Sequence, residues 1–256
     1  MAEIAVKIDD QEERFPGSIT VAEVLKSLMS GKQRKQTIAV YANDKAVDLD
    51  VELAEDTVIV PIKKDSPEAL EILRHSTSHI MAQAVRELFG EEVKIAIGPA
   101  IENGFYYDFL RDTPFSPEDF EKIEQKMAEI AGQALSFSHR DISRQEAIEM
   151  FREQGEKYKV ELLEEMVDDT VSIYQQGSFV DLCRGPHIPD TSWVKDFKLL
   201  RVAGAYWRGD EKNKMLTRIY GLAFETKDEL AAFIEQRKLA MERDHRKLGR
   251  ELDLFH

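Results

Sequence analysis

The chain has 256 residues, of which 43% are apolar, and this is enough to fill two hydrophobic cores. Its formal net charge of −14 argues against a protein that binds nucleic acid regardless of sequence, because such binding needs a concentrated basic surface. A single cysteine excludes an internal disulfide framework. Because no signal-like or membrane-spanning apolar segment is present, we expect a cytoplasmic protein without a membrane partner.

Residues 1–62 predict a small domain. Residues 20–29 have a helical pattern, and Thr20 with Glu23 forms a capping box at its start. Strand-like runs surround this helix at residues 2–8, 38–43 and 57–62. The order suits a ubiquitin-like β-grasp fold, in which one helix packs across a mixed sheet. Considered alone, this domain would be interpreted as a binding module.

Residues 63–225 predict a larger α+β domain, with helices packed on a mainly antiparallel sheet. A hairpin is expected at Asn103-Gly104, before an aromatic strand. Further helices are expected near residues 116–134, 144–154 and 158–166, and strands near residues 136–142, 170–175, 179–183, 197–207 and 215–224. Residues 226–256 are helical in pattern and predict a linker helix.

The first helix of the larger domain is expected between Ser66, a suitable N-cap, and Gly90, a suitable C-cap. Its apolar residues repeat at helical spacing, so we expect it to bury one stripe. His75 and His79 lie one turn apart on a face rotated away from that stripe. Their imidazoles are therefore expected to converge on one point.

Two short motifs carry chemistry, H-x-x-x-H on this helix and C-x-x-x-H at a strand end. Together they offer three imidazoles and a thiol that a tetrahedral zinc ion would accept, from His75, His79, Cys183 and His187. Chemistry without a metal is equally open, because neutral histidine can orient or deprotonate water and a cysteine of lowered pKa can act as a nucleophile. Asp181 shares a strand face with Cys183 and could orient an imidazole or an ammonium group.

Four stretches resemble the editing domain of bacterial-type threonyl-tRNA synthetases. In chain order they are RHSTSHIMAQAV, AIGPAIENGFYYDF, GEKYKVELL and VDLCRGPHIP. Residues 1–62 resemble the TGS domain of that family, and RDHRKLGRELDLFH resembles the connector into its aminoacylation domain. Alanyl-tRNA synthetase editing domains share the His and Cys pairs but not this N-terminal module. The chain is thus similar to an N-terminal fragment, in which the aminoacylation domain of the full-length enzyme is absent.

The resemblance implies post-transfer editing, the hydrolysis of serine wrongly esterified to the acceptor end of threonine tRNA. Serine lacks only a methyl group, which is worth about 1–3 kcal/mol of discrimination, so a second sieve is needed. The implied catalytic residues are His75, His79, Lys159, Cys183 and His187, and the implied substrate-binding residues are Tyr107 and Asp181. In this interpretation His75 positions water or acts as a general base, Lys159 activates water or stabilises charge, and Asp181 binds the substrate amino group.

The resemblance implies that editing requires no cofactor and that ATP does not bind here, while zinc at the His/Cys cluster stays open. Two other functions fit the same residues. One is a zinc-dependent hydrolase of a small ester or amide, with three or four ligands from the cluster. The other is a noncatalytic module, in which the β-grasp domain binds RNA or a protein and the cluster is structural.

Overall fold

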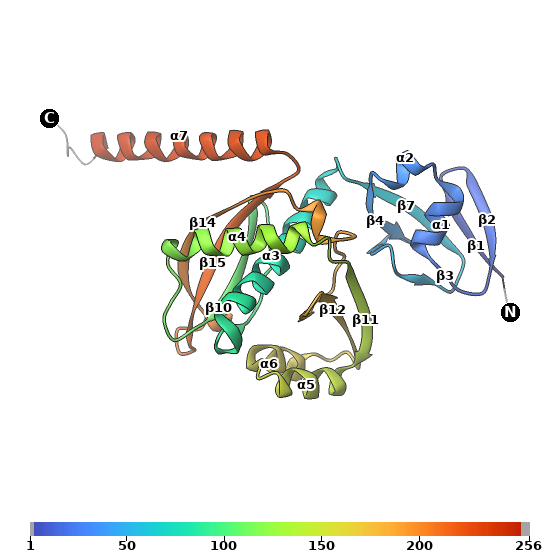
Figure 1. The fold of residues 1–256 in the computed structure, drawn as a ribbon, viewed down its shortest axis with the longest axis horizontal. Coiled ribbons are helices and arrows are strands. Elements are labelled where there is room, and N and C mark those ends of the chain that lie inside the picture. Colours follow the sequence, from blue (N-terminus) through green and yellow to red (C-terminus); the bar gives the residue numbers. More distant parts are fainter. Residues whose placement is uncertain (1–2, 252–256) are drawn as a thin grey trace.

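The computed structural model describes the backbone of residues 3–251 and the side chains of residues 3–243. Helices and strands are mixed along the chain, and among the described strand pairs all but one are antiparallel, which confirms the expected α+β class. Figure 1 shows an N-terminal part in blue, a larger central part, and a long C-terminal helix that projects from it. Within the described part of the chain, no helix has the length and apolar character needed to cross a membrane.

The N-terminal part is a five-stranded mixed sheet of order β2-β1-β7-β4-β5, in which β1 and β7 are parallel. Its strands are β1 (Glu3–Ile8), β2 (Gln11–Pro16), β4 (Thr37–Ala42), β5 (Lys45–Val47) and β7 (Thr57–Lys63), and the small elements β3 (Ile19–Thr20), α2 (Gly31–Arg34) and β6 (Glu52–Leu53) connect them. Helix α1 (Val21–Leu28) begins with the expected capping box and packs on this sheet, because Val24 shares a buried core with Val6 and Ile59. The expected helix on a mixed sheet is therefore present.

Helix α3 (Pro67–Phe89) is the central element of the larger part. The expected ends are confirmed, since Ser66 Oγ accepts the Ala69 N–H and Gly90 ends the helix at a φ of 73°. The expectation of one buried stripe is wrong, because every side chain from residue 76 to residue 85 is buried. The helix tolerates this because buried hydroxyls such as that of Thr77 donate back to carbonyl groups one turn earlier.

Helices α3 and α4 (Phe120–Gly132) pack against an antiparallel sheet of order β14-β15-β10-β8. Its strands are β8 (Lys94–Ile95), β10 (Gly104–Leu110), β14 (Asp196–Tyr206) and β15 (Met215–Phe224). The short strand β9 (Ala100–Ile101) also pairs with β10. The predicted hairpin is displaced by one residue, because its two-residue loop is Glu102–Asn103 and Gly104 already pairs in β10. Glycine is required there, since a Cβ would lie 2.2 Å from the Gly221 carbonyl oxygen.

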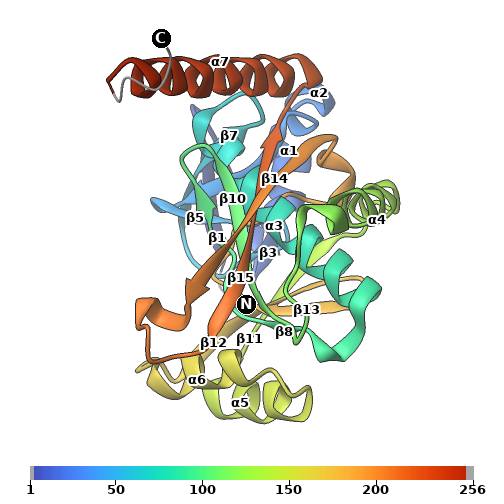
Figure 2. The same cartoon turned by 90° about the vertical axis from the view of Figure 1, so that its left-hand side faces the viewer.

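A second sheet, of order β11-β12-β13, carries α5 (Arg144–Glu153) and α6 (Lys157–Glu165) on one side. Its strands are β11 (Phe137–Ser143), β12 (Thr170–Gln176) and β13 (Phe179–Leu182), and 3-10 turns lie at Gly90–Glu92, Pro117–Asp119, Thr191–Trp193 and Trp207–Gly209. Figure 2 shows α5 and α6 at the end of the molecule opposite α7 (Lys227–Glu251).

The core of the central part continues into the N-terminal sheet. Ile38 and Ile62 belong to the same buried cluster as Ile72 and Leu73 of α3. The N-terminal sheet therefore lies directly against the helix that carries His75 and His79. This contact brings residues of the N-terminal part close to the predicted site.

Candidate active site

The seven predicted site residues come from distant segments and form one connected group. Helix α3 contributes two of them, β10 and α6 one each, and β13 with the turn after it the other three; in chain order they are His75, His79, Tyr107, Lys159, Asp181, Cys183 and His187. Contacts between neighbours connect the whole set, and two halves can be distinguished. We call them the His/Cys half and the ion-paired half.

The His/Cys half places three imidazoles around one thiol. The His187 ring stacks on His75 at 4.6 Å between centroids and meets His79 edge-on at 4.4 Å. The Cys183 Sγ atom lies 2.9 Å from His75 Nε2 and 3.4 Å from His187 Nε2. The H-x-x-x-H and C-x-x-x-H motifs therefore converge on one point and form a single site.

A serine next to His75 determines which nitrogen of His187 carries the proton. The Ser76 hydroxyl donates its hydrogen to the Ile72 carbonyl at 2.8 Å, so its oxygen accepts from His187 Nδ1 at 3.0 Å. The Nε2 lone pair of neutral His187 consequently points to the Cys183 side of the cluster. Nε2 can therefore accept a proton or bind a metal ion, while the hydrogen bond from Nδ1 to Ser76 fixes the orientation of the ring.

Burial keeps the His/Cys half uncharged at neutral pH. Desolvation lowers the pKa of His75, lowers that of His79 to about 3, and lowers that of His187 well below its usual value. The 3.8 Å contact between His79 Nε2 and Asp181 is therefore not an ion pair at neutral pH. Desolvation also raises the pKa of Cys183 to about 12, so the lowered pKa that a cysteine nucleophile needs is not provided.

The ion-paired half is buried as deeply and keeps its charges. Lys159 Nζ forms an ion pair with Asp181 Oδ1 and donates to the Tyr107 hydroxyl oxygen at 3.1 Å, and that hydroxyl donates to Asp181 Oδ2. Burial alone would raise the pKa of Asp181, but Lys159, His79 and these hydrogen bonds together hold it below its usual range. Burial keeps the pKa of Tyr107 well above its usual value, so the phenol stays a hydrogen-bond donor.

The His/Cys half also fits a zinc ion in its chemistry. The four donor atoms all lie within 4.8 Å of one another, and they are the nitrogen and sulfur ligands that zinc prefers. Two ligands of a tetrahedral zinc ion lie about 3.5 Å apart, so His75 Nε2 and Cys183 Sγ, at 2.9 Å, would have to separate slightly. His75, His79, Cys183 and His187 would hold such an ion.

Two cavities reach the site. A cavity of about 400 Å³ is bounded by His75 and Cys183 on one side and by Tyr41 and Ile62 of the N-terminal sheet on the other. A second cavity of about 290 Å³ reaches Lys159 and Asp181 from beside α5 and α6. The first is within the range of small-molecule sites, and it gives access to the His/Cys half.

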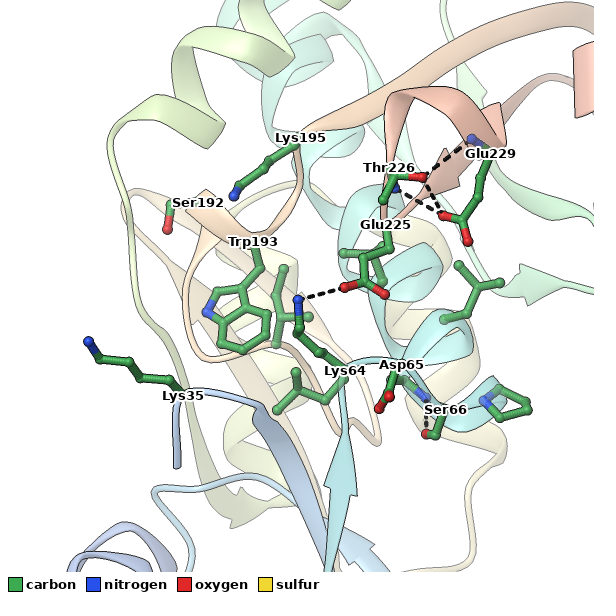
Figure 3. Close-up of a pocket in the computed structure, with 16 residues that line it drawn as sticks. Lys35, Lys64, Asp65, Ser66, Ser192, Trp193, Lys195, Glu225, Thr226 and Glu229 are labelled. Carbon is green, nitrogen blue, oxygen red and sulfur yellow. Dashed lines mark hydrogen bonds and ion pairs between the residues drawn. The ribbon is translucent and has the colours of Figure 1, made fainter. Parts of the chain in front are cut away.

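A larger cavity, of about 880 Å³, lies elsewhere (Figure 3). It opens where the N-terminal sheet meets the starts of α3 and α7, and the Lys64–Glu225 ion pair of 2.8 Å crosses it. None of the seven predicted residues is among those described as lining it, and its three lysines are balanced by three acidic residues. Size alone therefore does not identify the chemical site.

Sequence reasoning missed several side chains that touch the site. Phe137 stacks on the His187 ring at 4.7 Å, Tyr174 meets it edge-on at 4.6 Å, and Asp48 accepts the His187 N–H at 2.6 Å. The position of Ser76 beside His75 in the sequence was a usable signal. The other three come from segments far from either motif, and no pattern in the sequence pointed to them.

Comparisons with known proteins indicate the family to which this chain is similar. Residues 171–220 match the family model described as the threonyl and alanyl tRNA synthetase second additional domain. Threonine–tRNA ligases of Pelobacter propionicus and of Geobacter sp. strain M21 are 51% and 52% identical over 256 residues, all of this chain and 40% of each relative. That of Anoxybacillus flavithermus is 50% identical over 248 residues, 96% of this chain and 38% of the relative.

The chain spans about two fifths of the length of these curated relatives. The matched residues 171–220 include all of β12 but its first residue, β13, and the turn with Cys183 and His187, so the match overlaps part of the candidate site. The chain therefore belongs to the threonine–tRNA ligase family and carries the second additional domain that threonyl and alanyl tRNA synthetases share.

Proposed function

We propose that this chain hydrolyses the ester that joins serine to the acceptor end of threonine tRNA. One observation carries the proposal: a neutral His/Cys group and a buried ion pair meet where His79 Nε2 lies 3.8 Å from Asp181, and a cavity of about 400 Å³ gives access to the former. Hydrolysis of an ester needs a site for water, an acceptor for its proton and a positive charge near the developing oxyanion. The two halves supply these three requirements, and no ATP is needed.

His75 is the residue we assign to the attacking water. It lines the accessible cavity, and its lowered pKa leaves the imidazole neutral and able to orient water or accept its proton at pH 7. His79 and His187 pack against it and keep its ring in place. Cys183 acts as a neutral thiol that contacts His75 and not as the nucleophile.

Lys159 is the residue we assign to charge stabilisation. Its ammonium group has three N–H donors, and the contacts described above use two of them, on Asp181 and Tyr107. The third donor is available for an oxyanion. Asp181, ionised at neutral pH, supplies the negative charge for the amino group of serine, and Tyr107 holds that carboxylate in place.

The test is release of labelled serine from seryl-tRNA(Thr), with threonyl-tRNA(Thr) as the substrate to be spared. We expect His75→Ala and Lys159→Ala each to lower the rate by about 10²–10⁴-fold. The matched control is Lys157→Ala, an exposed lysine on the same helix as Lys159, which should keep the wild-type rate. Wild-type release no faster than in buffer, or equal release of serine and threonine, would refute the proposal.

A zinc-dependent hydrolase is the second candidate, and the four donor atoms within 4.8 Å of one another favour it. A bound zinc ion would polarise the substrate carbonyl group and lower the pKa of a water molecule. Elemental analysis of gently purified protein separates the two candidates. About one zinc per chain, with hydrolysis lost in a chelator and restored by zinc, would support it, whereas hydrolysis that survives the chelator in zinc-free protein excludes it.

A further inference from the structure

One carboxylate of the N-terminal part contacts the turn that carries His187. Asp48 lies between β5 and β6 and is buried, although Asp50 in the same loop is exposed. Its Oδ1 atom accepts the backbone N–H of His187 at 2.6 Å, and its Oδ2 atom accepts the Tyr174 hydroxyl. Both partners belong to the central part, more than 120 residues away in the sequence.

These contacts hold the backbone just before His187. A Cβ at Gly185 would lie 1.9 Å from the Tyr174 hydroxyl oxygen and 3.2 Å from Asp48 Oδ2, so the turn is pressed against the Asp48–Tyr174 pair. Gly185 also has a φ of 61°, which disfavours any other residue. The Tyr174 ring in turn packs edge-on against the imidazole of His187. Both the backbone and the ring of His187 are therefore held by this pair.

The position of His187 affects the rest of the His/Cys half. Its ring stacks on His75, and its Nε2 atom lies 3.4 Å from the Cys183 sulfur. A displacement of the turn would thus move His75 and Cys183 relative to the accessible cavity. Misplacement of catalytic groups by about 1 Å is sufficient to lower a rate by about 100-fold.

The placement of Asp48 has a free-energy cost, which its hydrogen bonds do not fully offset. Desolvation raises the pKa of Asp48, and the bonds from His187 and Tyr174 lower it by less. A buried carboxylate of this kind is poor evidence for a stabilising role. The contacts it makes are instead directed at the site.

We propose that Asp48 is a positioning residue for the candidate active site, supplied by the N-terminal part, which holds the turn at Gly185–His187 so that the His187 ring supports His75. This inference rests on the proposed hydrolysis of an aminoacyl ester. It gives the N-terminal part a role in the chemistry that is separate from any contact with tRNA. Asp48 acts through His187 and has no role in binding the ester.

Three variants test it by steady-state deacylation of seryl-tRNA(Thr). Asp48→Ala should lower kcat by about 10–100-fold and change KM less than twofold. Asp48→Asn should restore most of kcat, because the amide oxygen accepts the His187 N–H and the amide nitrogen can donate to the Tyr174 oxygen. Asp50→Ala is the matched control, since it removes the half-exposed contact to His139 at the same interface and should leave kcat unchanged.

Amide hydrogen exchange at His187 gives a readout that does not depend on activity. Exchange should accelerate about tenfold or more in Asp48→Ala and stay at the wild-type rate in Asp50→Ala. If the wild-type chain deacylates nothing, the proposed function fails while the exchange data still decide whether Asp48 holds the turn. Equal losses of kcat in Asp48→Ala and Asp50→Ala, or unchanged exchange in Asp48→Ala, would overturn the inference.

Tyr174→Phe keeps the test decisive if Asp48→Ala does not fold. This variant keeps the ring against His187 and removes one of the two hydrogen bonds of Asp48. We expect a smaller loss of kcat than in Asp48→Ala, of about threefold to tenfold, with KM unchanged. A Tyr174→Phe variant with wild-type kcat and wild-type exchange at His187 would contradict the role of the Asp48–Tyr174 pair.

Discussion

The two halves of the candidate site are buried to a similar degree, but the groups of the His/Cys half are neutral, whereas Lys159 and Asp181 of the ion-paired half are ionised. In the His/Cys half no opposite charge makes a direct contact strong enough to offset desolvation, so the imidazoles stay neutral and the thiol stays protonated. In the ion-paired half Lys159 and two hydrogen-bond donors reach Asp181, and the carboxylate stays ionised. The comparison teaches that direct contacts, more than depth of burial, decide which of these groups stay neutral and which stay ionised.

Removing one partner of the ion pair should have the largest effect on stability. Lys159→Ala leaves the buried Asp181 carboxylate unpaired, and we expect a loss of about 3–5 kcal/mol in the free energy of unfolding, measured with urea. A double variant, Lys159→Met with Asp181→Asn, removes both charges and should recover at least half of that loss.

The exposed pair between Arg152 and Glu164 on the neighbouring helices is the control for this experiment. Both side chains are more than half exposed, so Arg152→Ala should cost less than about 1 kcal/mol. If Lys159→Ala and Arg152→Ala cost the same, burial does not strengthen the Lys159–Asp181 pair and the contrast between the two halves fails.

A glycine behind Tyr107 allows the ion-paired half to be disturbed without changing a charge. A Cβ at Gly98 would lie 1.9 Å from the Tyr107 ring, so Gly98→Ala must displace that ring from Asp181. We expect a loss of about 1–3 kcal/mol in unfolding free energy. Gly132→Ala is the matched control, because nothing lies within 4 Å of its added Cβ, and it should be neutral or slightly stabilising. Equal stability of the two variants would show that Tyr107 is not held by packing.

The neutral imidazoles of the His/Cys half should make the free energy of unfolding depend on pH. The pKa values of His75, His79 and His187 are lowered in the folded chain, so below about pH 6.5 the unfolded chain binds more protons than the folded chain. The free energy of unfolding therefore decreases as the pH is lowered. His79, whose pKa in the folded chain is about 3, contributes a loss of about 1 kcal/mol by pH 5.5, and His75 and His187 add to it in the same direction. His139, whose pKa is raised mainly by Asp50, works in the opposite direction.

Urea unfolding from pH 7.5 to 5.5, with a chelator present, measures this slope. His79→Gln removes the contribution of one buried imidazole and should reduce the loss of stability over this range by about 1 kcal/mol. Wild-type stability that is constant over this range would mean that the histidines are protonated in the folded chain, and the comparison between a neutral half and a charged half would be wrong.

The sequence predicted those features that depend on local chemistry. The ends of α3 follow from Ser66 and Gly90, because an N-cap hydroxyl and a left-handed C-cap act within a few residues. The strands and helices of the central part follow from side-chain periodicity in the same way. The two histidines on one face of α3 follow from helix geometry alone. The His and Cys motifs also predicted four residues that the fold brings together, and the resemblance to a known family added Lys159 and Tyr107.

Only the tertiary structure decided how these residues meet and in which charge state. Burial of a polar helix on all sides depends on carbonyl acceptors and on neighbouring sheets, so periodicity predicted a single stripe for α3 and was wrong. The raised pKa of Cys183 results from the packing around it and cannot be read from its motif. Asp48 reaches His187 across 139 residues, and no local pattern encodes such a contact. Sequence periodicity reports the path of the backbone, whereas charge state and long-range contacts depend on what the folded chain brings together.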